Sequence, residues 1–375
     1  MRDAIVFSTG TWERFNVPER ISLALASLGC KVLHCEPPVS ILRSKPQPLR
    51  NVGAGIHALR LAFLSSRFNH VPGGALAQAR ALRDQIERAA SECGLRDPIF
   101  FYGFMSELFP ICVLMKRDHF IVHICMDHSA QNPKYDRLVE ISDKTLVIPR
   151  SCFHKFRAKY GEKIDMIPQS VDFTSLALLV TNDSSDPAIA DIPRPRLGYL
   201  GEPSRNLNRS LLASLLKMRP HWHFLSLGPE KAVPLPNAHT LPWMRPDAFA
   251  RYLGSVDVGF MPYDCYDEER LHGIPLKMFE YFTLGIPVVS TPLIHLWQFR
   301  DVVYFGDTAE ELCLCIEAAL SEPPNSPKRT MRIETAREHS LENLATVLLD
   351  CLPLAGPPPL RTLDAPGNRP PIVEG

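Results

Sequence analysis

Three observations predict an α/β protein with two domains, each built on a parallel sheet between helices. A strand at Ala4–Ser8, a helix at Pro18–Gly29 and a strand at Lys31–Glu36 follow one another, which is the order that builds a parallel sheet. The same alternation restarts at Arg196. The chain has 375 residues and is too long for one ordinary hydrophobic core. We therefore expect two domains of similar construction.

The N-terminal domain is expected to cover residues 1–173. Pro18 near the start of its first helix and Gly29 at the end are typical of helix boundaries. The later elements alternate in the same way and are predicted at 74–93 (helix), 98–103 (strand), 106–116 (helix), 119–127 (strand), 144–149 (strand) and 151–161 (helix). Residues 164–172 close this domain.

A second domain is expected over residues 196–328, after a linker at 174–195 that is rich in Asp, Ser and Pro and has no clear period. Its strands are predicted at 196–201, 222–228, 238–243, 256–263, 286–291 and 302–306, and its helices at 207–218, 246–253, 276–284 and 308–321. A helix across 329–353 is expected to complete the fold. The proline-rich residues 354–375 are expected to form a disordered tail.

Composition and charge exclude several classes of protein. Lys plus Arg and Asp plus Glu both number 41, so the formal net charge is zero and no nucleic-acid partner is expected. No apolar run approaches the roughly 20 residues of a membrane helix. The N-terminus lacks a signal-peptide pattern, so a cytoplasmic location is expected. The ten cysteines show no paired zinc spacing, which indicates reduced thiols rather than a metal site.

The segment Gly273–Thr291 carries the strongest chemical signal. Lys277 lies in the first turn of its predicted helix, where a cation faces the positive end of the helix dipole at a cost of up to ~1 kcal/mol. A bound anion reverses that sign, so free N–H groups and a lysine together suit a phosphate. Glu280 lies on the same helix face and could accept from ribose hydroxyls. The alternative is a surface Lys–Glu pair on an ordinary helix.

This stretch resembles the nucleotide-sugar signature of GT-B glycosyltransferases, written roughly P-x-K-x-x-E-Y-x-x-x-G-x-P-V-V. The resemblance implies two Rossmann-like domains facing across a cleft, a C-terminal helix that crosses back to the first domain, and a donor site in the second. It assigns Lys277 to the donor diphosphate and Glu280 to the ribose. The matching residues are Pro275, Lys277, Glu280, Tyr281, Gly285, Pro287, Val288 and Val289.

Other segments extend the resemblance, which is to bacterial exopolysaccharide and teichuronic-acid type transferases. The segment "RLGYLGEPSRNLN" is similar to the opening strand and glycine loop of the donor domain, so Gly201 is expected to approach the diphosphate and Arg205 to bind phosphate. His272 stands eight residues before Glu280, where many retaining members have a glutamate. A retaining mechanism is therefore not implied, and His272 is a candidate for the donor phosphates or sugar.

Asp127 is the candidate general base for the acceptor hydroxyl. It ends the strand "HFIVHICMD", and ligands of open α/β sheets bind beyond the carboxyl ends of strands. The alternative is an aspartate that caps the next segment. The loop Thr9–Gly10–Thr11 follows the first strand, so it could bind acceptor or sugar, although a tight turn is equally consistent. His123 lies on the same side of its strand as Asp127, and the alternative is a core histidine.

The basic and apolar residues 49–67 could lie on an anionic membrane. The alternative, which we prefer, is an ordinary helix of the first domain with a solvated basic side.

The resemblance implies a hexosyl transferase that moves sugar from a nucleotide-diphosphate donor to a glycan, lipid-linked or small-molecule acceptor, with no cofactor and no metal. A nucleotide-sugar epimerase or hydrolase on the same fold would use the same donor residues. A catalytically silent binding or scaffold protein would also keep them. A nicotinamide-linked oxidoreductase is disfavoured, because the loop after the first strand lacks G-x-G-x-x-G.

Overall fold

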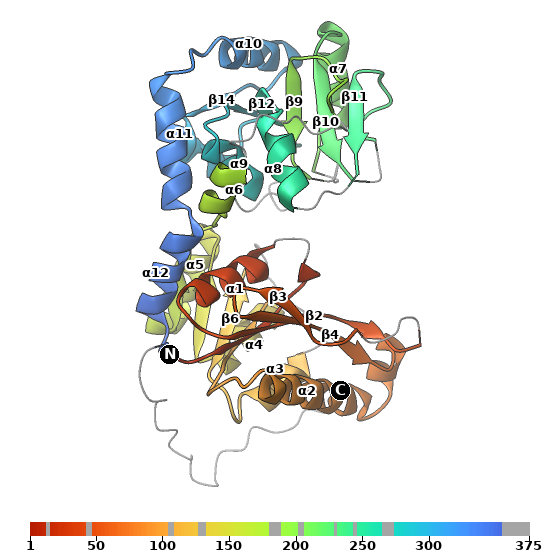
Figure 1. Cartoon of the computed structure of the whole chain (residues 1–375), viewed down its shortest axis with the longest axis vertical. Coiled ribbons are helices and arrows are strands. Elements are labelled where there is room, and N and C mark those ends of the chain that lie inside the picture. The colour runs from red at the N-terminus through yellow and green to blue at the C-terminus, as the bar shows by residue number, and fades with distance from the viewer. Residues whose placement is uncertain are drawn as a thin grey trace.

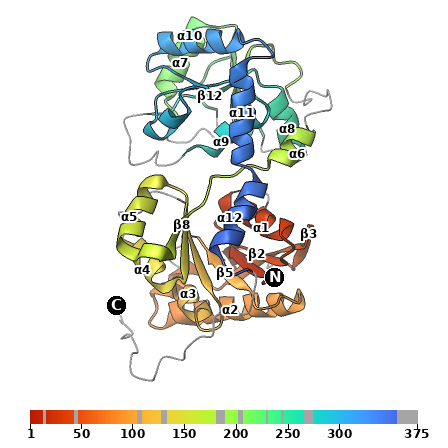
Figure 2. The same cartoon turned by 90° about the vertical axis from the view of Figure 1, so that its left-hand side faces the viewer.

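Two lobes lie along the long axis of the molecule, each around its own sheet, and a helical segment at the C-terminal end runs alongside both (Figures 1 and 2). The predicted α/β architecture with two parallel-sheet domains is confirmed. The computed structural model describes residues 1–12, 16–42, 47–103, 109–126, 133–179, 189–201, 206–228, 231–242, 246–264 and 274–354.

The first sheet has eight strands, and β1 lies between β2 and β5. All of its pairings are parallel except that of β3 with β4. In spatial order the strands are β3 (Arg50–Gly53), β4 (Ile56–Phe63), β2 (Val32–Ser40), β1 (Ala4–Phe7), β5 (Ile99–Tyr102), β6 (Ile121–Cys125), β7 (Lys144–Val147) and β8 (Ile164–Met166).

The second sheet has six parallel strands, and β9 lies between β10 and β12. In spatial order they are β11 (Ala238–Leu241), β10 (His223–Leu227), β9 (Arg196–Tyr199), β12 (Val258–Met261), β13 (Val288–Ser290) and β14 (Val303–Phe305). In both sheets the strand order reverses beside the first strand. Ligands of open α/β sheets bind at this switch point, outside the carboxyl ends of the strands.

Helices cover both faces of the first sheet, which explains why its central strands β1 and β5 are wholly hydrophobic and buried. The N-terminal helices are α1 (Val17–Ser27), α2 (Gly74–Glu92), α3 (Phe109–Met115), α4 (Pro133–Ile141) and α5 (Arg150–Tyr160). The later ones are α6 (Phe173–Leu179), α7 (Arg209–Met218), α8 (Pro246–Gly254), α9 (Leu276–Thr283), α10 (Ala309–Leu320), α11 (Pro327–Glu338) and α12 (Leu341–Cys351). On the first sheet, α1 and α12 share a core with Ala4 and Val6, whereas α2 and α3 pack on Ile5 and Phe7.

The C-terminal segment crosses back to the first domain, as predicted. Helix α11 packs on α9 of the second domain and α12 packs on α1 of the first. The single helix expected at 329–353 is two helices, however, and the break falls at His339 and Ser340. The Ser340 hydroxyl accepts from the Asn343 amide at 3.2 Å and so caps α12. The break lets the two helices follow two different domains.

Residues 49–67 differ from the sequence expectation. They form the β3–β4 hairpin and a short 3₁₀ turn, not a basic amphipathic helix. The pairing of β4 with β2 decides this, because a short run of mixed apolar and basic residues fits a strand as well as a helix. The ordinary helix that we preferred is therefore wrong for this segment, and contact of residues 49–67 with a membrane stays a prediction. No helix within the described part of the chain is long and apolar enough to cross a membrane.

Two further differences concern the expected linker and tail. Residues 173–179, at the start of the expected linker, form α6, which packs against α8 and α9 through Leu176 and Phe173. The helix is too short for its period to be recognised in the sequence. At the other end, Leu354 is fully buried in the first domain's core and its carbonyl accepts from the Arg2 amide at 2.9 Å. The expected tail beyond this residue lies outside the described residues.

Arg332 fastens α11 to the second domain and is fully buried. Its guanidinium donates to the Gly285 carbonyl at 3.1 Å and to the Val302 carbonyl at 3.4 Å, and it pairs with the Glu322 carboxylate at 3.1 Å. The glycine that ends α9 is therefore tied to the crossover segment through one side chain.

We expect Arg332→Ala to lower the free energy of unfolding by about 3–5 kcal/mol, because it removes the cationic partner of Glu322 and the donor to two backbone carbonyls. Urea unfolding followed by circular dichroism measures this. Glu334→Ala, on an exposed position of the same helix, serves as the control. A loss no larger than the control's would contradict the anchoring role.

Candidate functional site

Helix α9 is held against the end of β9 by Tyr281. The Tyr281 hydroxyl donates to the Gly198 carbonyl at 2.6 Å and accepts from the Leu200 amide at 2.9 Å. Met278, Phe279 and Phe282 are buried, so α9 packs its apolar face onto the sheet as its spacing predicts. Its N-terminal turn therefore lies beside the loop that follows β9.

Lys277 extends from that first turn over the loop. Its Nζ lies 3.3 Å from the centroid of the Tyr199 ring and 5.6 Å from that of Tyr263, which are cation–π contacts. A β-carbon on Gly201 would lie 3.4 Å from Nζ, and Gly201 has a φ of +135° that favours glycine. Gly201 and Lys277, expected from sequence at one phosphate site, are thus neighbours. Among the described residues no carboxylate pairs with Lys277.

Glu280 has a different partner, in the other domain. Its Oε1 accepts from Nη2 of Arg20 at 3.0 Å, and the two side chains are 13% and 7% exposed. Arg20 also donates through Nη1 to the Ser170 carbonyl. Lys277 and Glu280 therefore do not form the surface pair that was the alternative for this helix. Each is engaged separately, one toward β9 and one toward the first domain.

Arg20 was not identified from the sequence as a site residue. It lies in the first turn of α1, which starts at the carboxyl end of β1. The only signal in the sequence is this position, because the first helix of an open α/β sheet begins at the ligand-binding edge. Its contact with Glu280 shows that the carboxyl edges of the two sheets face each other.

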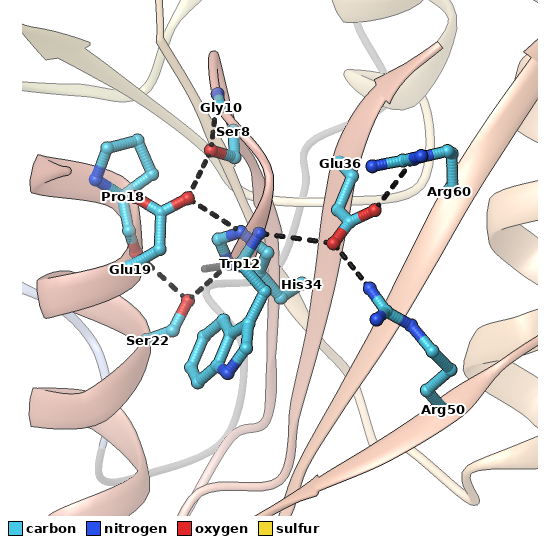
Figure 3. Close-up of polar contacts among 10 residues, drawn as sticks. All are labelled: Ser8, Gly10, Trp12, Pro18, Glu19, Ser22, His34, Glu36, Arg50 and Arg60. Carbon is cyan, nitrogen blue, oxygen red and sulfur yellow. Dashed lines mark hydrogen bonds and ion pairs between the residues drawn. The ribbon is translucent and has the colours of Figure 1, made fainter. Parts of the chain in front are cut away.

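The loop Thr9–Gly10–Thr11 is held by polar side chains beneath it (Figure 3). The Ser8 hydroxyl accepts from the Gly10 amide at 3.0 Å and donates to Oε1 of Glu19 at 2.7 Å. Thr9 is exposed and Thr11 is half-buried. The loop leaves β1 at the switch point of the sheet, where the sequence placed a candidate acceptor contact.

The carboxylate of Glu19 is fully buried beneath this loop. It lies 3.1 Å from Nε2 of His34, whose Nδ1 lies 2.9 Å from the Ser22 hydroxyl (Figure 3). Glu19 and Arg20 are adjacent on α1 but contact different domains. Glu19 forms hydrogen bonds within the first domain, whereas Arg20 pairs with Glu280 of the second domain.

His123 lies in the core of the first domain and is 1% exposed. Its Nδ1 lies 3.2 Å from the Tyr102 carbonyl, and no described residue forms a hydrogen bond with its buried Nε2. Burial lowers the pKa of His123 to about 4, so the ring is neutral at physiological pH. This position agrees with the core-histidine alternative, because an acceptor outside the sheet edge would not reach the ring.

Three candidates, Asp127, Arg205 and His272, lie outside the described residues, so their roles stay predictions. Within the part of the chain that the structure describes, no group of three His, Cys, Asp or Glu side chains could hold a metal ion.

Comparison with solved structures gives the fold class. An apo structure of OtsA covers 95% of this chain and 100% of its own, with a TM-score of 0.65 at 14% identity. The fold is GT-B. A trehalose-6-phosphate structure from E. coli bound with UDP-2-fluoro glucose gives a TM-score of 0.62 at 13% identity, over 93% of this chain and 98% of that one.

Other comparisons are weaker. A structure from Listeria monocytogenes that is provisionally named as a UDP-N-acetylglucosamine 2-epimerase gives a TM-score of 0.53 at 12% identity, over 93% of this chain and 95% of that one. In sequence, the chain is 26% identical to a Bacillus subtilis (strain 168) protein provisionally named as the teichuronic acid biosynthesis glycosyltransferase TuaH. That match spans 38% of each chain. No protein-family model matches.

The burial of His123 predicts an acid-sensitive stability. The unfolded histidine takes up a proton below its ordinary pKa of 6.5, while the folded one stays neutral down to a pKa of about 4. The contribution of neutral His123 to the free energy of unfolding is therefore fully present above pH 6.5. It falls by roughly 3 kcal/mol as the pH drops toward 4. We expect His123→Gln to show a flatter decline between pH 7 and 5 in urea unfolding. Exposed His154→Gln is the control, and identical slopes for all three proteins would refute the prediction.

Proposed function

We propose that the protein is a glycosyltransferase that moves a sugar from a nucleotide-diphosphate donor to an acceptor at the first domain. The observation that carries this is the arrangement on α9. A lysine with no carboxylate partner among the described residues lies beside the glycine loop after β9, and a carboxylate lies one turn further on. This pair suits a diphosphate followed by a ribose.

The donor roles follow from this arrangement. Lys277 would bind the diphosphate, Gly201 would let the backbone approach it, and Glu280 would accept from the ribose hydroxyls. Arg205 and His272 would add contacts to the phosphates or sugar. One oxygen of Glu280 is engaged by Arg20, and no contact among the described residues engages the other.

The acceptor would lie on the first domain, beside the exposed Thr9 of the Thr9–Gly10–Thr11 loop. Asp127 would take the proton of the acceptor hydroxyl, since it follows the carboxyl end of β6, with Met126 between them. Lys277 and Arg205 would offset the charge of the leaving diphosphate, so the proposal needs no metal and no cofactor. We propose transfer of a hexosyl group, and UDP-sugars are the first donors to test, because one similar structure contains UDP-2-fluoro glucose.

The structural similarity to a UDP-N-acetylglucosamine 2-epimerase supports a second candidate. An epimerase or hydrolase on this fold would convert the donor without any acceptor. A panel of UDP- and GDP-sugars read by thermal shift, followed by product analysis with and without acceptor, separates the candidates. Conversion in the absence of acceptor would favour the epimerase or hydrolase, and no nucleotide binding at all would favour a silent scaffold protein.

We expect Lys277→Ala to weaken UDP binding about 10- to 100-fold, because a charge-assisted contact contributes ~1.5–3 kcal/mol. Uridine binding should change little, since the nucleoside lacks phosphates. Isothermal titration calorimetry measures both. The control is Lys217→Ala, an exposed lysine of the same domain. Equal losses for UDP and uridine would contradict a phosphate role for Lys277.

Arg20 is expected to position Glu280 for the ribose. Without the guanidinium, the nearly buried carboxylate would lose its partner and shift toward solvent. Arg20→Ala should therefore reduce the preference for UDP over 2′,3′-dideoxy-UDP by about tenfold, and calorimetry compares the two ligands. Exposed Arg80→Ala is the control. An unchanged preference, with UDP itself bound normally, would show that Arg20 has no part in ribose recognition.

A further inference from the structure

A second group of charged residues gathers on the first domain, on strands that the donor site does not use. Glu36 on β2 is 1% exposed and accepts from Nη2 of Arg50 at 2.6 Å and from Nε of Arg60 at 3.0 Å (Figure 3). Glu36 and Arg60 are register partners, and Arg50 pairs with Ala58, two residues before Arg60. These side chains therefore point to one face of the sheet. We call Glu36, Arg50 and Arg60 the Glu36 cluster.

The Glu36 cluster has more donors than the chain uses. A guanidinium carries five N–H groups, and within the described part of the chain Arg50 and Arg60 each make one hydrogen bond, to Glu36. Nε of Arg50 is buried and has no hydrogen-bond partner among the residues that the structure describes. Two guanidiniums also share one carboxylate, which leaves one positive charge in excess. The nearby Glu19 makes no contact with these arginines among the described residues; its contacts are with Ser8 and His34.

Its place in the fold is that of an acceptor site. Glu36 lies one residue beyond Cys35, the register partner of the last residue of β1, so the cluster lies at the carboxyl edge of the sheet. The Trp12 amide donates to Oε1 of Glu36 at 3.1 Å, which ties the cluster to the loop after β1. The side chains of Arg50 and Arg60 are 35% and 24% exposed, so both are anchored by Glu36 and still partly open to solvent.

We propose that Arg50 and Arg60 bind a phosphate group of the acceptor, with Glu36 fixing the direction of both guanidiniums. The planar fork of arginine matches the oxygens of a phosphate, and a guanidinium already held by a carboxylate loses little freedom on binding. The inference rests on the proposed transferase function and narrows its acceptor to phosphorylated molecules.

The test is calorimetric titration of inorganic phosphate into the full chain saturated with UDP, which occupies the donor phosphate site. Arg50→Gln and Arg60→Gln should each weaken phosphate binding at least tenfold, and Arg60→Lys should weaken it less. Glu36→Gln should strengthen binding, because it removes a negative charge next to the anion. Exposed Arg80→Gln, on α2 over the other face of the sheet, is the control. Circular dichroism melting checks that each variant is folded.

Opposite signs for the arginine and glutamate variants would support the site. Equal weakening in all three would show that the cluster only supports the fold. No effect of either arginine variant, or no phosphate binding by the wild type, would overturn the proposal. If UDP binding persists in these cases, the proposed transferase function is unaffected. If the wild type does not bind UDP at all, the proposed transferase function is overturned instead.

Two further titrations distinguish a soluble phosphate from a lipid one. Glucose 1-phosphate is titrated into the UDP-saturated protein, and phosphatidylcholine vesicles with phosphatidic acid are tested by co-sedimentation. Binding of the sugar phosphate alone, reduced in Arg50→Gln and Arg60→Gln, indicates a soluble acceptor. Vesicle binding that the same variants abolish indicates a lipid phosphate. If neither probe responds to these variants, phosphate recognition by the cluster is refuted.

Discussion

The contact between Arg20 and Glu280 joins two residues that lie 260 positions apart in the chain. Both side chains are almost buried, and a charge removed from water needs an opposite charge and good hydrogen bonds beside it. Their pairing therefore requires that α1 and α9 meet with their N-terminal turns toward each other. Because each helix begins at the carboxyl edge of its own sheet, this single requirement also places the two ligand-binding edges face to face.

The connections between the domains reinforce this arrangement. The two chain segments that pass between the domains lie side by side, since the Val171 amide donates to the His339 carbonyl at 2.8 Å and the Leu341 amide to the Val171 carbonyl at 3.1 Å. The ring of His339 also stacks on Phe279 of α9 at 4.0 Å between centroids. Helix α9 therefore contacts the crossover through Phe279 and the first domain through Glu280. Nucleotide binding at α9 would be linked to the relative placement of the domains.

Although the formal net charge is zero, cations gather locally along the carboxyl edges of the two sheets. Lys277 lies against aromatic rings, and Arg50 and Arg60 share a single carboxylate. The aromatic rings orient the ammonium group and the carboxylate orients the two guanidiniums. Each cation still has N–H donors that could bind an anion. Such sites attract anions locally even when the whole chain carries no excess charge.

The sequence by itself determined those features that depend on the spacing of residues close together in the chain. The alternation of apolar strands and helices specified two parallel-sheet domains, and the three-residue spacing of Lys277 and Glu280 put both on one helix face. The family resemblance assigned Gly201 and Lys277 to one phosphate site; the structure brings the two together, and their phosphate role stays a prediction. Only the tertiary structure decided which partners these groups have. The pairing of Glu280 with Arg20, the strand conformation of residues 50–63, and the break at His339 and Ser340 all depend on segments distant in the chain. Local propensity carries no information about such contacts, because they form only when separate elements pack.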